Sequence, residues 1–209
     1  MDKNRTQELI VSSRLILIGM IFWVIKLQYF TFFWLPENAF FANIGFEILG
    51  TIVILTGIII IYRIYPFIDS IIAKYMLIAI LLLNAVQFFL YNNIVFRQIH
   101  SFVPVMMSLV LFIITKLMKH SLRYFSNDEL SAKWDMLGNT IFFGFSIPFY
   151  IFIAAHICNL IKYDTILKPT VKILFLFIPI GIIILIFFIY FIRILFSTLK
   201  FLNLQKNKK

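Results

Sequence analysis

The sequence predicts an all-α integral membrane protein whose single membrane domain covers residues 1–209 and contains six transmembrane helices. Hydrophobic residues make up 62% of the chain, above the roughly 45–50% that is usual in soluble domains. Apolar runs long enough to cross a bilayer recur along it. The 19 Lys and Arg residues gather at helix ends and tails instead of along one soluble face, which excludes nucleic acid as a partner.

Proline and polar residues mark where the spans end. Pro36 disfavours a helical conformation at the residue before it, so we expect the first span to stop there. Pro66 ends the second span, Asn92 begins the turn after the third, and Pro104 predicts a kink in the fourth. The expected spans cover residues 13–35, 40–65, 69–91, 94–118, 138–161 and 171–199.

The polar interval 119–135 is predicted to be a loop that leads into a short amphipathic helix at about residues 127–137. Ser126 and Glu129 have the spacing of a capping box, in which each side chain accepts a hydrogen bond from the backbone amide of the other residue. We expect this helix to lie in the membrane interface, anchored by its tryptophan. The alternative is that the loop docks a partner through Arg123, Lys133 and Trp134.

The charge distribution predicts the orientation of the chain. Six spans place both termini on one side of the membrane, and most of the Lys and Arg residues fall on that side. Because cytoplasmic loops carry the excess of basic residues, we expect both termini to be cytoplasmic. The chain would then be a multi-pass protein of a prokaryotic cytoplasmic membrane.

Glu47 is the most informative single residue, because it lies inside the almost wholly apolar run 40–62. On a helix, Asn43, Gly50 and Gly57 share its face. Small residues allow another helix to approach closely. We therefore expect Glu47 to point into a helix bundle and not into lipid.

The strongly polar groups inside the spans are predicted to lie at one depth, in the outer half of the membrane. Lys26 and Glu47 both lie about 10–14 Å below the outer surface at 1.5 Å per residue, while the cytoplasmic half should be nearly pure hydrocarbon. Buried ions must be paired or wetted, so the two residues either neutralise each other or belong to an outward-facing pocket for an ion, a proton or a small ligand. The candidate pocket residues are Lys26, Glu47, Asn84, Gln87, Arg97, His100, His156 and Asn159.

Two of these residues carry a narrower hypothesis. His100 and His156 are expected at equal depth on consecutive spans, where two imidazoles could ligate one b-type haem axially. The alternative is that each histidine forms a hydrogen bond across helices. No close metal-ligand spacing, P-loop or nucleophile elbow occurs in the sequence, so we expect no metal site and no catalysis by this chain alone.

Part of the chain resembles the DoxX-like small membrane proteins. The resemblance rests on residues 14–22 followed by Lys26, on the stretch 57–66, and on Asn84, and it extends at most over residues 14–118. It implies a four-helix membrane protein, of a family in which some members are subunits or partners of quinone-linked or thiol oxidoreductases. By size and topology alone, the chain is also similar to the membrane components of energy-coupling-factor importers and to six-helix exporter permeases.

These observations predict a non-catalytic accessory subunit or small transporter with an outward-facing polar pocket. Its partners would be the lipid bilayer and either another protein or a second copy of the chain. One alternative is a redox membrane protein linked to quinone or haem. Another is a membrane-anchored accessory protein of a stress, immunity or phage-defence system, which would act through its basic cytoplasmic loop.

Overall fold

The computed structural model describes residues 3–32, 37–90, 103–147 and 171–207. It describes side chains for residues 4–23, 44–90, 103–144, 146–147 and 186–207. All regular structure in these ranges is helical. The elements are α1 Lys3–Phe32, α2 Glu37–Ile64, α3 Ile68–Phe89, α5 Val103–Tyr124, α6 Asp128–Ile141, the π-helix η1 Phe142–Ser146, and α8 Val171–Asn207.

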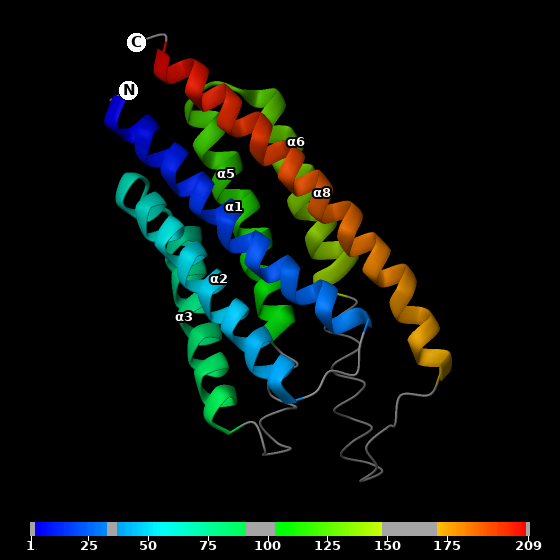
Figure 1. Ribbon diagram of the computed structural model, residues 1–209. Coiled ribbons are helices and arrows are strands. Elements are labelled where there is room, and N and C mark those ends of the chain that lie inside the picture. Colours follow the sequence, from blue (N-terminus) through cyan, green and yellow to red (C-terminus); the bar gives the residue numbers. More distant parts are fainter. Residues whose placement is uncertain (1–2, 33–36, 91–102, 148–170, 208–209) are drawn as a thin grey trace.

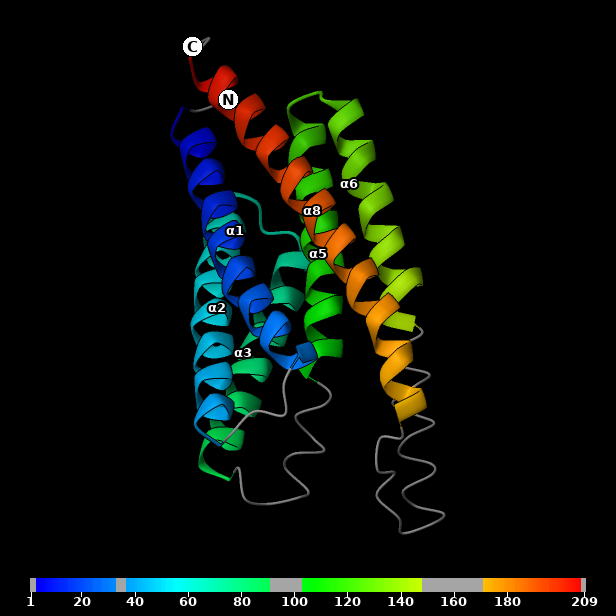
Figure 2. The ribbon, with the colours of Figure 1, turned by 45° about the vertical axis from the view of Figure 1, so that its right-hand side comes forward.

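The six α-helices form an antiparallel bundle in which neighbours close a ring (Figure 1, Figure 2). Each helix contacts the next in the order α1, α2, α3, α5, α6, α8, and α8 also contacts α1. The start of α1, the end of α8 and the α2–α3 and α5–α6 turns lie together, and we call this the terminal end. The opposite end, where α5 and α8 begin, is the distal end.

Five helices of the described part are long and apolar enough to cross a membrane. Their apolar segments are Asn4–Trp23, Ile44–Ile64, Ile68–Phe89, Val103–Tyr124 and Ile186–Asn207. The expected all-α fold is therefore confirmed for the described residues, with five helices that could cross a membrane. The predicted sixth span, 138–161, lies partly outside the described residues, but its beginning occupies a place in the ring through α6 and η1.

Helices α1 and α2 approach so closely that neither Gly19 nor Gly50 has room for a side chain. A Cβ atom on Gly19 would lie 2.6 Å from the carbonyl oxygen of Gly50, and a Cβ atom on Gly50 would lie 2.8 Å from that of Gly19. Farther along the same contact, the hydroxyl of Ser12 donates a 2.9 Å hydrogen bond to the carbonyl of Gly57. The close approach predicted at Gly50 and Gly57 is confirmed, and α1 is the helix that makes it.

Several helices extend beyond the predicted spans at the terminal end. α1 begins at Lys3 instead of residue 13, α5 continues to Tyr124, and α8 continues to Asn207. Hydropathy marks the part of a helix that faces hydrocarbon, whereas Lys, Arg, Glu and Gln are good helix formers that extend a helix into water. The boundaries predicted from apolar runs were therefore too short there.

A helix is present where the interfacial helix at 127–137 was predicted, but the expected anchoring in the interface by Trp134 is wrong, because Trp134 is buried against protein. Only residues 125–127 separate α5 from α6. The helix is capped by Asn127, whose side chain accepts a 3.1 Å hydrogen bond from the Leu130 amide, and not by Ser126, which has a φ of 54°. α6 then continues without a break into η1, running back along α5.

Candidate functional site

Two amide side chains lie on the buried face of α3 near the distal end. This face repeats at helical spacing and consists of Ser70, Ala73, Leu77, Ile80, Asn84 and Gln87. It packs between α2 and α5. Asn84 is fully buried and Gln87 is 2% exposed, and none of their four amide N and O atoms has a hydrogen-bond partner among the residues that the structure describes. Buried amides are almost always hydrogen-bonded, so these two depart from the usual arrangement of a helix interior.

Glu47 is fully buried on α2, as its helical face predicted. One turn away, the hydroxyl of Thr51 donates a 2.6 Å hydrogen bond to the backbone carbonyl of Glu47. The same hydroxyl accepts a 3.2 Å hydrogen bond from the indole nitrogen of Trp23 on α1. A buried row of polar groups therefore links α1 to α2 beside the carboxylate.

A pair of hydroxyls joins α5 to η1. Ser108 donates a 2.7 Å hydrogen bond to the carbonyl of Val105, and its hydroxyl oxygen lies 3.0 Å from that of Ser146, within hydrogen-bond distance. Ser146 is fully buried at the end of the π-helix. π-Helical turns within α-helices often occur at functional sites, because the extra residue changes which side chains face inward.

These groups lie within about 10 Å of one another along the axis of the bundle. At 1.5 Å per residue, Glu47 and Ser146 lie about 26 Å from the terminal-end turns, and Asn84 and Ser108 lie about 24 Å from them. We call this set the polar belt, and it comprises Trp23, Glu47, Thr51, Asn84, Gln87, Ser108 and Ser146. The predicted common depth of Glu47, Asn84 and Gln87 in the membrane stays a prediction.

Trp23, Thr51, Ser108 and Ser146 were not predicted. Ser and Thr inside a span usually hydrogen-bond their own helix, so their sequence positions carry no signal of a site. Only the pairing of Trp23 with Thr51 and of Ser108 with Ser146 across helices distinguishes them. The belt thus supplies carboxylate, amide, hydroxyl and indole groups, which can hydrogen-bond a polar solute or coordinate a cation through oxygen.

Several predicted pocket residues fall outside this description. Lys26 belongs to α1, but its side chain lies outside the described part, and so the Lys26–Glu47 pair stays a prediction. Arg97, His100, His156 and Asn159 also lie outside the described residues. The haem hypothesis, which rests on the two histidines, therefore stays a prediction as well.

The terminal half of the bundle is more polar than predicted. Lys116 and Lys119 on α5 form ion pairs of 2.6 and 2.8 Å with the same oxygen of Asp135 on α6. Hydrogen bonds from Lys116 and Lys119 hold the pKa of Asp135 at about 2. Lys116 also donates a 3.3 Å hydrogen bond to Asn139. Residues 119–135 were predicted to form a loop. Lys116, Lys119 and Asp135 instead meet because α5 and α6 pack side by side.

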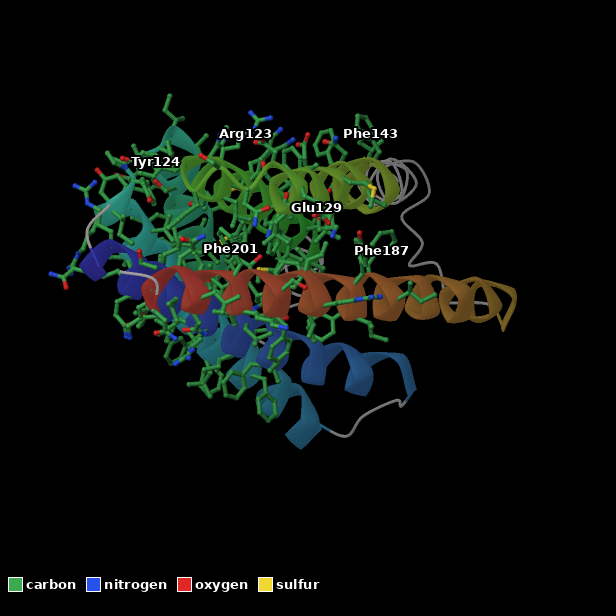
Figure 3. All side chains as sticks on the ribbon, turned by 90° about the horizontal axis from the view of Figure 1, so that it is seen from above. Arg123, Tyr124, Glu129, Phe143, Phe187 and Phe201 are labelled. Carbon is green, nitrogen blue, oxygen red and sulfur yellow. The ribbon has the colours of Figure 1, made fainter. Side chains whose placement is uncertain are left out.

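The predicted docking residues do not form one surface. Arg123 and Lys133 are exposed, and Arg123 points away from the bundle (Figure 3). Lys133 pairs with Glu129 one turn earlier. Trp134 is fully buried, and its ring meets that of Phe191 edge to face at 5.5 Å. Including Trp134 in a docking surface was therefore wrong, because its apolar face is covered by α8.

The chain matches no protein-family model, no curated protein and no solved structure. The DoxX-like resemblance stays a prediction.

Proposed function

We propose that this protein is a non-catalytic component of a prokaryotic cytoplasmic membrane, either a small transporter or an accessory subunit. Its polar belt would be a pocket that binds an ion, a proton or a small polar ligand from the outer side. The observation that carries the proposal is the burial of the Asn84 and Gln87 amides, without hydrogen-bond partners in the described part, at the level of Glu47.

The energetics of the membrane interior support a binding role. Ionisable and amide groups within a span are costly, and they are therefore typical of substrate and ion pathways. A structural role alone would favour mutual hydrogen bonds between the amides and their neighbours. Asn84 and Gln87 form none with described residues, which is the arrangement of a site that is completed by something it binds.

The position of the belt supports access from the distal side. Asn84 lies about 8 Å from the end of α3, and Ser108 lies about 8 Å from the start of α5. The terminal end, by contrast, carries most of the charged side chains of the described helices. Under the positive-inside rule this end would be cytoplasmic, and the distal end would face outward.

The orientation can be tested with fusions at the C-terminus. Green fluorescent protein fluoresces only when it is fused to a cytoplasmic terminus, and alkaline phosphatase is active only on the outer side. We expect a fluorescent fusion and an inactive phosphatase fusion. The opposite result would place the belt near the cytoplasm.

Access to the belt can be tested with single cysteines in a Cys158→Ser background, because Cys158 is the single cysteine of the chain. Asn84→Cys should react in whole cells with a membrane-impermeant thiosulfonate. The matched control is Ile80→Cys, which lies one turn earlier on the same buried face and toward the terminal end. It should remain unlabelled until the protein is denatured.

Equal protection of both cysteines would contradict a pocket that is open to the outside. Labelling of both cysteines at similar rates would mean that α3 as a whole is accessible to the reagent, and would also contradict a pocket at the belt. Size-exclusion profiles of both variants establish beforehand that each one folds.

A further inference from the structure

A groove of about 500 Å³ runs between α1 and α8 at the terminal end. Both helices also contact each other along this region of the ring. The groove contains no residue of the polar belt, and on α1 its lining ends at Leu17, about 9 Å along the helix from Trp23. Its occupant is therefore a question separate from that of the proposed function.

Two cations flank this groove. Arg14 on α1 and Lys200 on α8 both line it, and both are exposed. Among the residues that the structure describes, neither forms an ion pair with a carboxylate. Lys116, Lys119 and Lys133 at the same end all do. The groove thus holds two positive charges that its own protein surroundings do not neutralise.

The groove changes from polar to apolar along its length. Toward the end of α8 it is lined by two amides and one apolar residue, Asn203, Asn207 and Leu204, while the other side is lined only by apolar residues, Leu17, Phe196 and Leu199. The apolar run of the sequence predicts the membrane boundary near residue 13 on α1 and near residue 199 on α8. On this prediction, Arg14 and Lys200 lie at the boundary, with the apolar lining in the hydrocarbon.

We propose that this groove binds one anionic phospholipid of the cytoplasmic leaflet. Its headgroup phosphate would lie between Arg14 and Lys200, and one acyl chain would lie along Leu17 and Phe196. Arginine forms paired hydrogen bonds with phosphate oxygens, and basic grooves between helices on the cytoplasmic side are suited to anionic headgroups. A zwitterionic lipid offers the same chain but carries a cation that these two residues repel.

The test measures lipids retained by the purified full-length protein in native mass spectrometry during titration with phosphatidylglycerol or phosphatidylcholine. We expect one phosphatidylglycerol to be retained in preference to phosphatidylcholine. The double variant Arg14→Gln/Lys200→Gln should lose this preference, with affinity falling roughly thirty-fold for two charges near the surface. The conservative variant Arg14→Lys/Lys200→Arg should keep most of it and shows that the groove still folds.

The matched control is Arg63→Gln/Arg123→Gln, which removes two exposed positive charges from other helices at the same end. Neither residue lines the groove. Equal losses in both double variants would mean general surface attraction and would overturn the proposal. Displacement of the lipid by millimolar glycerol 3-phosphate would also overturn it, because the groove would then be a site for a soluble phosphate. Retention unchanged in Arg14→Gln/Lys200→Gln would overturn it outright.

Discussion

The indole nitrogen of Trp134 on α6 donates a 2.9 Å hydrogen bond to the hydroxyl of Thr198 on α8. Both residues are buried, and the hydroxyl of Thr198 donates a 3.0 Å hydrogen bond to the backbone carbonyl of Ile194. Since α8 also packs on α1, this contact helps to close the ring of helices. It also helps to explain why the apolar face of α6 is buried against protein.

Replacing Trp134 should loosen this closure. Trp134→Phe removes the donor to Thr198 and leaves a smaller ring, so we expect the free energy of unfolding in detergent to fall by about 2–3 kcal/mol. Met136→Ala is the control, because Met136 lies on the same helix but is 56% exposed. Thermal unfolding of both variants gives the comparison. A stable Trp134→Phe protein would show that α6 does not depend on α8.

The α1–α2 contact should tolerate no added methyl group at its closest point. Gly19→Ala would put a Cβ 2.6 Å from the Gly50 carbonyl and force the helices apart, so we expect a lower unfolding temperature. Gly45→Ala is the same chemical change on the partner helix α2, but its Cβ would meet nothing within 4 Å. It should raise the free energy of unfolding by about 0.5–1 kcal/mol, because alanine loses less backbone entropy in a helix.

If Gly19→Ala and Gly45→Ala changed stability in the same direction, close packing of α1 on α2 would not be what Gly19 provides. A third variant, Gly19→Ser, also adds a Cβ atom but has a lower helix propensity than alanine. If size decides the effect, Gly19→Ser should lower the unfolding temperature as Gly19→Ala does.

The ion-paired carboxylate on α6 predicts a pH dependence. Hydrogen bonds from Lys116 and Lys119 hold the pKa of Asp135 at about 2, below its ordinary value of 3.8. A lowered pKa in the folded state means that the carboxylate stabilises the fold above pH 4, and that this stabilisation is lost as the pH falls from about 4 to about 2.

Asp135→Asn should therefore lower the free energy of unfolding at pH 7 by on the order of 1 kcal/mol. The difference from wild type should shrink as unfolding is measured at successively lower pH below 4. Glu129→Gln is the control, because Glu129 pairs with Lys133 at an exposed position. It should have no measurable effect at pH 7. A pH-independent difference for Asp135→Asn would point to packing and not charge.

The buried amide on α3 predicts a conflict between stability and function. Asn84→Leu removes a polar group that has no hydrogen-bond partner in the described part and replaces it with an apolar side chain of similar size. We expect the free energy of unfolding to rise by about 1–3 kcal/mol, while activity in the host is lost if the belt binds a ligand. The reverse change on the same face, Ile80→Asn, should destabilise the protein.

A destabilised Asn84→Leu variant would mean that the amide is held by a structural hydrogen bond, and the binding proposal would lose its main support. Thermal unfolding decides this without any knowledge of the ligand. The host phenotype can then be interpreted separately.

Some of the candidate site could be predicted because helical periodicity acts over a few residues. Gly50 and Gly57 share a face with Glu47, so the direction in which the carboxylate points follows from the sequence, as does its depth relative to Asn84. The contribution of Trp23 could not be predicted in this way. Its partner Thr51 is 28 residues away, and no local pattern relates the two.

By itself, the sequence determined that the chain is helical and apolar enough to cross a membrane several times, and that Glu47 faces inward. These properties depend on hydropathy and on a 3.6-residue period, which are local. Only the tertiary structure decided whether the apolar face of α6 meets lipid or protein, because both are equally apolar and the same pattern suits either. It also decided which helices become neighbours, and hence that Asp135 meets Lys116 and that Trp134 is enclosed by α8.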